Sequence, residues 1–144
     1  SLTGEIDFHA LATTGDDVVG FDGVTGILTS NDTGTTWQQG APMAALSLAM
    51  IGDQVWATTP EGVMHSTDRA ATFNPLPDAP TLWQISAGID NSLWGVDIDG
   101  LAWCSTDGLT WTKHKRLPAI EAIAALDYDT AYAINDTALV ILTA

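Results

Sequence analysis

One short sequence occurs three times in this chain at nearly equal spacing. The copies are residues 30–37, 66–73 and 105–111, and each begins with Ser-x-Asp and ends on Thr followed by an aromatic residue. The three serines lie 36 and then 39 residues apart. A period of this length is typical of one small structural unit stacked several times, because such a unit cannot bury its apolar faces alone.

Each repeat has the pattern of four short β-strands separated by Gly- and Asp-rich turns. In the first unit the strands are expected at residues 8–14, 18–21, 27–30 and 35–39. The later strands are expected at residues 44–50, 54–59, 63–66, 71–74, 82–87, 92–96, 101–105, 109–113, 121–126, 130–134 and 139–143. Val19, Trp56, Trp94 and Tyr132 occupy one position of the second strand at intervals of 37 or 38 residues. No helical periodicity competes with this pattern.

Four antiparallel strands in each unit of about 40 residues are typical of β-propeller blades. We therefore predict an all-β chain, a single propeller segment over residues 1–144, with about three and three-quarter blades. The blades are expected at residues 7–40, 41–77, 78–117 and 118–144, and the last lacks its fourth strand. An open arc exposes strand edges and blade faces. Three ways to complete it remain open: a missing N-terminal half of a longer propeller, a second copy in a homodimer, or closure as a four-bladed ring.

The repeated box is predicted to shape a turn. Its Asp carboxylate can accept hydrogen bonds from nearby backbone N–H groups, glycine supplies an unusual backbone angle, and the aromatic residue packs under the turn. The expected structural residues are Ser30, Asp32, Gly34, Trp37, Ser66, Asp68, Phe73, Ser105, Asp107, Gly108 and Trp111.

The box resembles the Asp-box, or BNR repeat, of sialidases, other glycoside hydrolases, sortilin-type receptors and photosystem assembly propellers. The whole chain is similar to the C-terminal half of bacterial BNR-repeat, glycosyl-hydrolase-like proteins, on residues 4–11, 19–22 and 26–28. The resemblance implies an exported propeller of six to eight blades and an extracytoplasmic location.

Composition narrows the classes of partner. The formal charge is −14, with 18 acidic residues against four Lys and Arg, so neither nucleic acid nor an anionic membrane surface is expected to bind. No apolar run reaches the ~18 residues that span a bilayer. The single cysteine, Cys104, forms no intrachain disulfide and is expected to be buried. No metal or cofactor site is indicated.

The strand order predicts where a site lies. The boxes and the first-to-second turns share one face, while the loops leading into each blade and the second-to-third turns share the other. Sites of propellers usually lie on that second face. There we expect Asp7, Asp22 and Asp97 as candidate catalytic carboxylates and His9, Trp83, Asp99 and Glu121 as candidate ligand-binding residues. Trp83 suits either a sugar platform or packing between blades, and His9 either a base or a hydrogen-bonded rim residue.

Two main functions follow. The first is a non-catalytic binding or scaffolding propeller with a carbohydrate or protein ligand. The alternative is a glycoside hydrolase, which needs two carboxylates ~5–10 Å apart, for example Asp7 with Asp22 or Asp97. A sialidase is not expected, because that family uses three arginines and this chain holds only Arg69 and Arg116. A photosystem-type assembly factor is a third hypothesis, and the lack of a basic patch argues against it.

Overall fold

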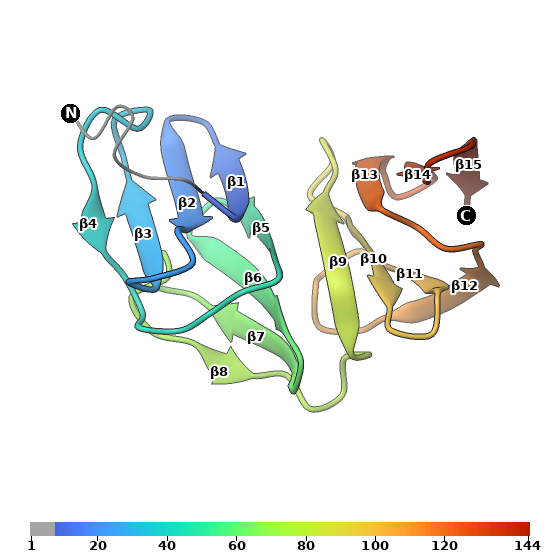
Figure 1. Cartoon of the computed structure of the whole chain (residues 1–144), viewed down its shortest axis with the longest axis horizontal. Helices are drawn as coiled ribbons and strands as arrows, with labels where there is room; N and C mark the ends of the chain where they lie inside the picture. Colours follow the sequence, from blue (N-terminus) through green and yellow to red (C-terminus); the bar gives the residue numbers. More distant parts are fainter. Residues whose placement is uncertain (1–7) are drawn as a thin grey trace.

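The computed structural model describes residues 8–144, and within them the chain is all-β (Figure 1). The first sheet contains β1 (Ala10–Thr14), β2 (Asp17–Phe21), β3 (Ile27–Ser30) and β4 (Gln38–Gln39). The second contains β5 (Ser47–Ile51), β6 (Gln54–Thr59), β7 (Gly62–Ser66) and β8 (Asn74–Pro75). The third contains β9 (Leu82–Ala87), β10 (Leu93–Asp97), β11 (Leu101–Ser105) and β12 (Thr112–Arg116). The last has only β13 (Ala122–Asp127), β14 (Thr130–Ile134) and β15 (Leu139–Thr143).

The four sheets are the blades of a β-propeller, which confirms the predicted fold class; they are called blades 1 to 4 below. Every sheet is an antiparallel meander in chain order. The first strands pack in series, β1 against β5, β5 against β9 and β9 against β13. Over residues 8–144 no comparable contact joins β13 back to β1, and these strands lie at the two ends of the series (Figure 1). The blades therefore form an arc with two end faces.

The core consists of three apolar layers, one between each pair of neighbouring blades. Val19 and Ile27 of blade 1 pack with Val55 and Ala57 of blade 2. The second layer joins Trp56 to Leu93, and the third joins Trp94 to Leu142. Two indoles also donate hydrogen bonds across the layers, Trp56 Nε1 to Gly108 O at 3.1 Å and Trp94 Nε1 to Asp127 O at 2.9 Å. The second strands β6 and β10 thus each hold their blade against the next.

The fourth strands begin later than predicted. Strands were expected at residues 35–39, 71–74 and 109–113, but the pairing starts at Gln38, Asn74 and Thr112. The reason is local. The box Asp accepts from a backbone N–H three or four residues later, as in Thr36 N to Asp32 Oδ1 at 2.8 Å, so the chain stays in a loop until the box aromatic residue. The Pro75 ring is tolerated because β8 is an edge strand.

Candidate functional site

The first two boxes form the same hydrogen-bonded turn. In the first, Asp32 Oδ1 accepts from Thr36 N at 2.8 Å and from Ser30 Oγ at 2.7 Å, while Ser30 Oγ accepts from Gly34 N at 2.9 Å. Asp68 Oδ1 makes the equivalent contacts with Thr72 N and the Ser66 hydroxyl. The threonine hydroxyl and then the threonine N–H lower the pKa of Asp32 and of Asp68 to about 2. These carboxylates are occupied within their own turns.

The third box closes differently because it is one residue shorter. Asp107 Oδ1 accepts from Leu109 N and from Thr110 N, both at 2.8 Å. Ser105 Oγ accepts from Gly108 N at 2.8 Å. The backbone N–H groups of Thr110 and then Leu109 lower the pKa of Asp107. The Asp and Ser therefore keep their local roles although the spacing has changed.

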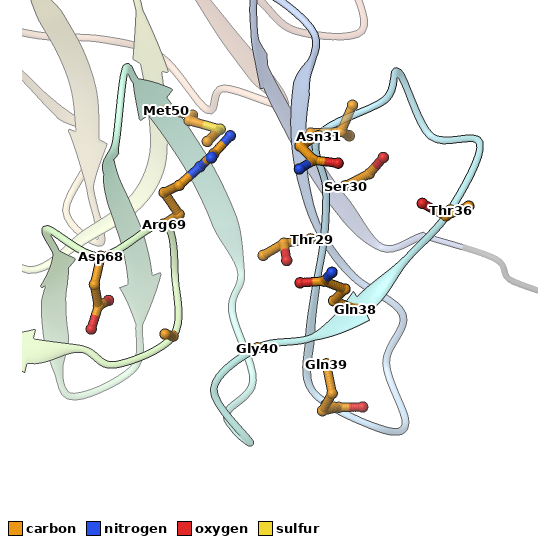
Figure 2. Close-up of a pocket in the computed structure, with 12 residues that line it drawn as sticks. Thr29, Ser30, Asn31, Thr36, Gln38, Gln39, Gly40, Met50, Asp68 and Arg69 are labelled. Atoms are coloured by element: carbon orange, nitrogen blue, oxygen red, sulfur yellow. The ribbon is translucent and has the colours of Figure 1, made fainter.

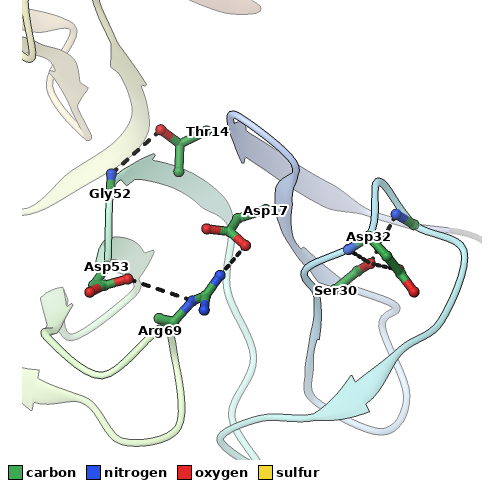
Figure 3. Close-up of polar contacts among 8 residues, drawn as sticks. Thr14, Asp17, Ser30, Asp32, Gly52, Asp53 and Arg69 are labelled. Atoms are coloured by element: carbon green, nitrogen blue, oxygen red, sulfur yellow. Dashed lines mark hydrogen bonds and ion pairs between the residues drawn. The ribbon is translucent and has the colours of Figure 1, made fainter.

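The first two boxes lie against first-to-second turns, as the strand order predicts. Thr33 N donates to Asp16 O and Arg69 N donates to Asp53 O, both at 3.0 Å. The Arg69 guanidinium also pairs with Asp17 of blade 1, and its Nε lies 3.6 Å from Asp53 Oδ1 (Figure 3). Arg69 thus links blade 1 to blade 2, with the modest energy expected of exposed ion pairs.

A cavity of about 230 Å³ opens beside this link, between blades 1 and 2. Figure 2 shows Thr29, Asn31 and Gln38 of blade 1 on one side and Arg69 on the other. Most of these groups are neutral hydrogen-bonding side chains, and the cation is already paired with carboxylates. The sequence did not predict this cavity, because the Arg69–Asp17 pair beside it joins two blades across 52 residues of chain.

A second cavity, of about 320 Å³, lies between blades 3 and 4. It is built from the β10–β11 turn and the segment that leads into blade 4, so it opens on the face opposite the boxes. It brings together two of the predicted ligand-binding residues, Trp83 and Asp99. Its other lining residues were not predicted from the sequence; the available signal was Ile98, an apolar residue between two aspartates in a turn. These residues are Val96, Ile98, Gly100, Leu117, Ala119 and Ile120.

The described candidate catalytic carboxylates cap their own turns. Asp22 Oδ1 accepts from Val24 N at 2.9 Å and from Thr25 N at 2.8 Å, and Oδ2 accepts from the Thr25 hydroxyl. The Thr25 hydroxyl is the largest cause that lowers the pKa of Asp22 to about 2. At the same turn of blade 3, Asp97 has a similar set of partners. They are Asp99 N and Leu101 N on Oδ1 and Trp103 Nε1 on Oδ2, each at 2.9 Å.

The other candidate residues do not join the second cavity. The His9 ring lies over the turn of its own blade, where a Cβ at Gly23 would come within 3.0 Å of it, and it meets Phe21 edge-on at 6.3 Å. Glu121 is exposed, and its backbone N donates to Ile134 O at 2.8 Å. Asp7 lies outside the described residues.

Three further observations concern metal ions, membranes and the single cysteine. Residues 8–144 contain no group of three or more His, Cys, Asp or Glu side chains arranged to hold a metal ion. Within the same range, no helix has the length and apolar character needed to cross a bilayer. Cys104 is buried, and burial raises the pKa of its thiol.

Comparison with known proteins supports the fold. No protein-family model matches the chain, and no curated protein matches it. The structure is similar to YCF48 bound to D1 peptide, with a TM-score of 0.62 and 15% identity over 93% of this chain and 50% of that one. It is similar to the GH74 xyloglucanase from Xanthomonas campestris, with a TM-score of 0.70 and 17% identity over 94% of this chain and 24% of that one.

A third similar structure is the computationally designed Ika4 protein, with a TM-score of 0.62 and 16% identity over 99% of this chain and 95% of that one. The chain spans about half the length of the YCF48 structures that it matches. At these identities the likeness shows the fold alone. The fold, with its turn caps and two interblade cavities, therefore defines the chain as a β-propeller protein.

Proposed function

We propose that this chain is a non-catalytic binding or scaffolding propeller of the Asp-box class. The observation that carries this proposal is the hydrogen bonding of the Asp22 and Asp97 carboxylates. Each carboxylate accepts three hydrogen bonds from groups of its own blade, so most of its ~four acceptor positions are already engaged. A general acid needs a raised pKa, whereas the pKa of Asp22 is lowered, and a nucleophile needs a free oxygen facing the substrate.

The cavity between blades 3 and 4 is the proposed ligand site, and a carbohydrate is the ligand class that it suits best. Trp83 offers an aromatic surface, Ile98 and Ile120 add apolar contacts, and the Asp99 carboxylate can accept hydrogen bonds from sugar hydroxyls. The cavity also lies on the face where ligands of propellers are expected.

The test is calorimetric titration with soluble xyloglucan, cello- and chito-oligosaccharides, together with a reducing-sugar assay for hydrolysis. Binding of one class without turnover supports the proposal. Ile98→Ser removes an apolar contact with the ligand and should weaken binding ~5-fold, about 1 kcal/mol. Ile89→Ser is the matched control, since Ile89 is exposed to a similar extent, 83% against 70%, but does not line the cavity.

The alternative is a glycoside hydrolase that uses Asp22 or Asp97. Sugar hydrolysis that disappears in Asp22→Asn and in Asp97→Asn, with the fold retained, would establish that alternative and reject the non-catalytic proposal. If none of the oligosaccharides binds, the carbohydrate class is wrong, and soluble peptides become the next ligands to titrate.

We further propose an extracytoplasmic location, as the resemblance to exported propellers implies. Fractionation of the source cells, with an antibody raised against the chain, tests this. Detection in the cytoplasm alone would contradict it.

A further inference from the structure

Blade 4 ends the arc with an apolar face that no other part of the described chain packs against. Cross-strand partners share a face of a sheet, and the register places Ile134 opposite Leu139 and Tyr132 opposite Ile141. Ile134, Leu139 and Ile141 are 47%, 60% and 56% exposed. The blade-4 open face is uncharged and consists of Ala122, Ala124, Tyr132, Ile134, Leu139 and Ile141.

The same face of each earlier blade is buried against the next blade. Tyr132 occupies the position of Val19, Trp56 and Trp94. Val19 packs in one layer with Ala70, the glycine position of the second box. Trp56 packs under Gly108, the glycine of the third box, and donates its indole N–H to Gly108 O at 3.1 Å. The blade-4 open face is therefore an interblade surface that has no neighbour.

Blade 1 has the opposite face, which no other described blade covers. The box aromatics Phe73 and Trp111 pack into the layer shared with the preceding blade. Within residues 8–144 no blade packs before blade 1, and its box residue Trp37 meets Phe8, with ring centroids 4.8 Å apart. Leu11 of β1 lies beside the Phe8 ring over Gly20 and is 53% exposed. The blade-1 open face consists of Phe8, Leu11, Gly34 and Trp37.

We infer that the blade-4 open face of one copy binds the blade-1 open face of a second copy, and that two such contacts close one ring of eight blades. The arc already contains this kind of interface between each pair of neighbouring blades, so the proposed contact continues the series. Tyr132 would then cover Gly34 of the second copy as Trp56 covers Gly108. Gly34 has room for this, because a Cβ there would meet only the Trp37 ring, at 3.4 Å or more.

The geometry favours a second copy as the occupant. Each chain carries one face of each kind, so a head-to-tail contact made twice leaves no apolar face exposed. Eight blades lie within the usual range of ~4–8 for propellers. Neither face presents a charged side chain, so chains with a formal charge of −14 each can meet there without bringing like charges together.

The first measurement is the mass of this 144-residue chain by sedimentation equilibrium, with an expected value twice 15.1 kDa. Ile141→Lys and Leu11→Lys each place a cation in the proposed contact and should weaken association at least ~100-fold, because the cation would be buried unpaired. Both positions are exposed in the single chain, so the fold is expected to survive, as far-UV circular dichroism will show.

Val24→Lys and Ile89→Lys are the controls, since both residues are exposed apolar side chains away from the two faces. They should leave the dimer intact. Mixing Leu11→Glu with Ile141→Lys should restore association, because one of the two contacts is then unaltered and the other pairs Glu with Lys.

Two outcomes would overturn the inference. The first is a wild-type chain that stays monomeric over the whole concentration range. That result is expected if another segment of a longer protein covers these faces. The second is a dimer that is lost in Ile141→Lys but kept in Leu11→Lys, since that pattern means that two blade-4 faces bind each other.

Discussion

At the scale of single residues, the boxes depend on left-handed backbone conformations. Gly34 and Gly108 have φ values of 83° and 74°, and in the second box Arg69 and Ala70 adopt 59° and 69°. Such angles cost ~1–2 kcal/mol in residues with a side chain. Ala70 accepts this cost where its methyl group is fully buried between blades 1 and 2. Gly34 and Gly108 avoid this cost at the equivalent position, while Thr33 of the first box, with φ 61°, bears it as Arg69 does.

Gly108→Ala is expected to lower the free energy of unfolding by ~3 kcal/mol. The new Cβ would come within 2.5 Å of Cε2 of Trp56, so overpacking adds to the backbone strain. Gly52→Ala is the matched control, because Gly52 has φ 58° and no atom within 4 Å of a Cβ, and it should cost only ~1 kcal/mol. Urea unfolding of the two variants checks the difference; equal losses would show that Trp56 does not constrain position 108.

Three turn-capping carboxylates, two of them in boxes, predict how stability depends on pH. The folded state lowers the pKa of Asp22, Asp32 and Asp68 from 3.8 to about 2. Their contribution is therefore complete above about pH 4 and is lost as the pH falls from about 4 to about 2. The Thr36 hydroxyl is the largest cause for Asp32, so Thr36→Val should make this loss shallower. Urea midpoints across this pH range, with Thr35→Val as control, provide the measurement; identical curves would contradict it.

At the scale of elements, the second strands hold the blades together through buried indoles. Trp56 and Trp94 both donate across a blade interface, whereas Trp111 Nε1 is buried without a hydrogen-bond partner in residues 8–144. Packing alone holds Trp111, while packing and a directed hydrogen bond hold the other two.

Trp56→Phe should therefore destabilise the chain by ~2–3 kcal/mol, because it leaves a space in the core and removes the donor to Gly108 O. Trp111→Phe should cost at least ~1 kcal/mol less, since it also removes an unpaired polar group. Thermal unfolding followed by circular dichroism compares the two. A larger loss in Trp111→Phe would mean that the cross-blade hydrogen bond contributes little.

At the scale of the whole molecule, the arc of blades has two apolar ends. Within residues 8–144, blade 4 has three strands. Its outer strand β15 contacts His114 of blade 3, whose Nε2 lies 2.7 Å from Thr143 O. The fold of a single chain thus leaves apolar area that association would remove from water.

This arrangement predicts that thermal stability depends on protein concentration. Association of folded chains stabilises them by mass action, so the melting temperature should rise as the concentration rises. In Ile141→Lys the melting temperature should be lower and independent of concentration. Differential scanning calorimetry at several concentrations is the measurement, and a wild-type melting temperature that does not move would argue against association.

The sequence by itself determined the features that depend on near neighbours in the chain. Strand pattern, blade period and the hydrogen bonds of the boxes follow from Gly and Asp turns and from contacts over at most five residues, such as Ser105 Oγ to Thr110 O. The turn caps of Asp22 and Asp97 are equally local, and a glycine four residues after Asp22 and three residues after Asp97, just before a strand, was a usable signal. The late start of the fourth strands was not predicted, because the length of each box loop is set by the contact between the box Asp carboxylate and the threonine N–H.

Only the tertiary structure decided what lies between blades. It placed Trp83 with Asp99 and Ile120 in one cavity, left His9 and Glu121 outside it, and brought Arg69 to Asp17. It also showed that Leu11 and Ile141 remain exposed at the two ends of the arc. These contacts join residues far apart in the chain, so they depend on how each blade is oriented against the next. The repeated boxes specify each blade, and the packing of the blades decides which surfaces stay open.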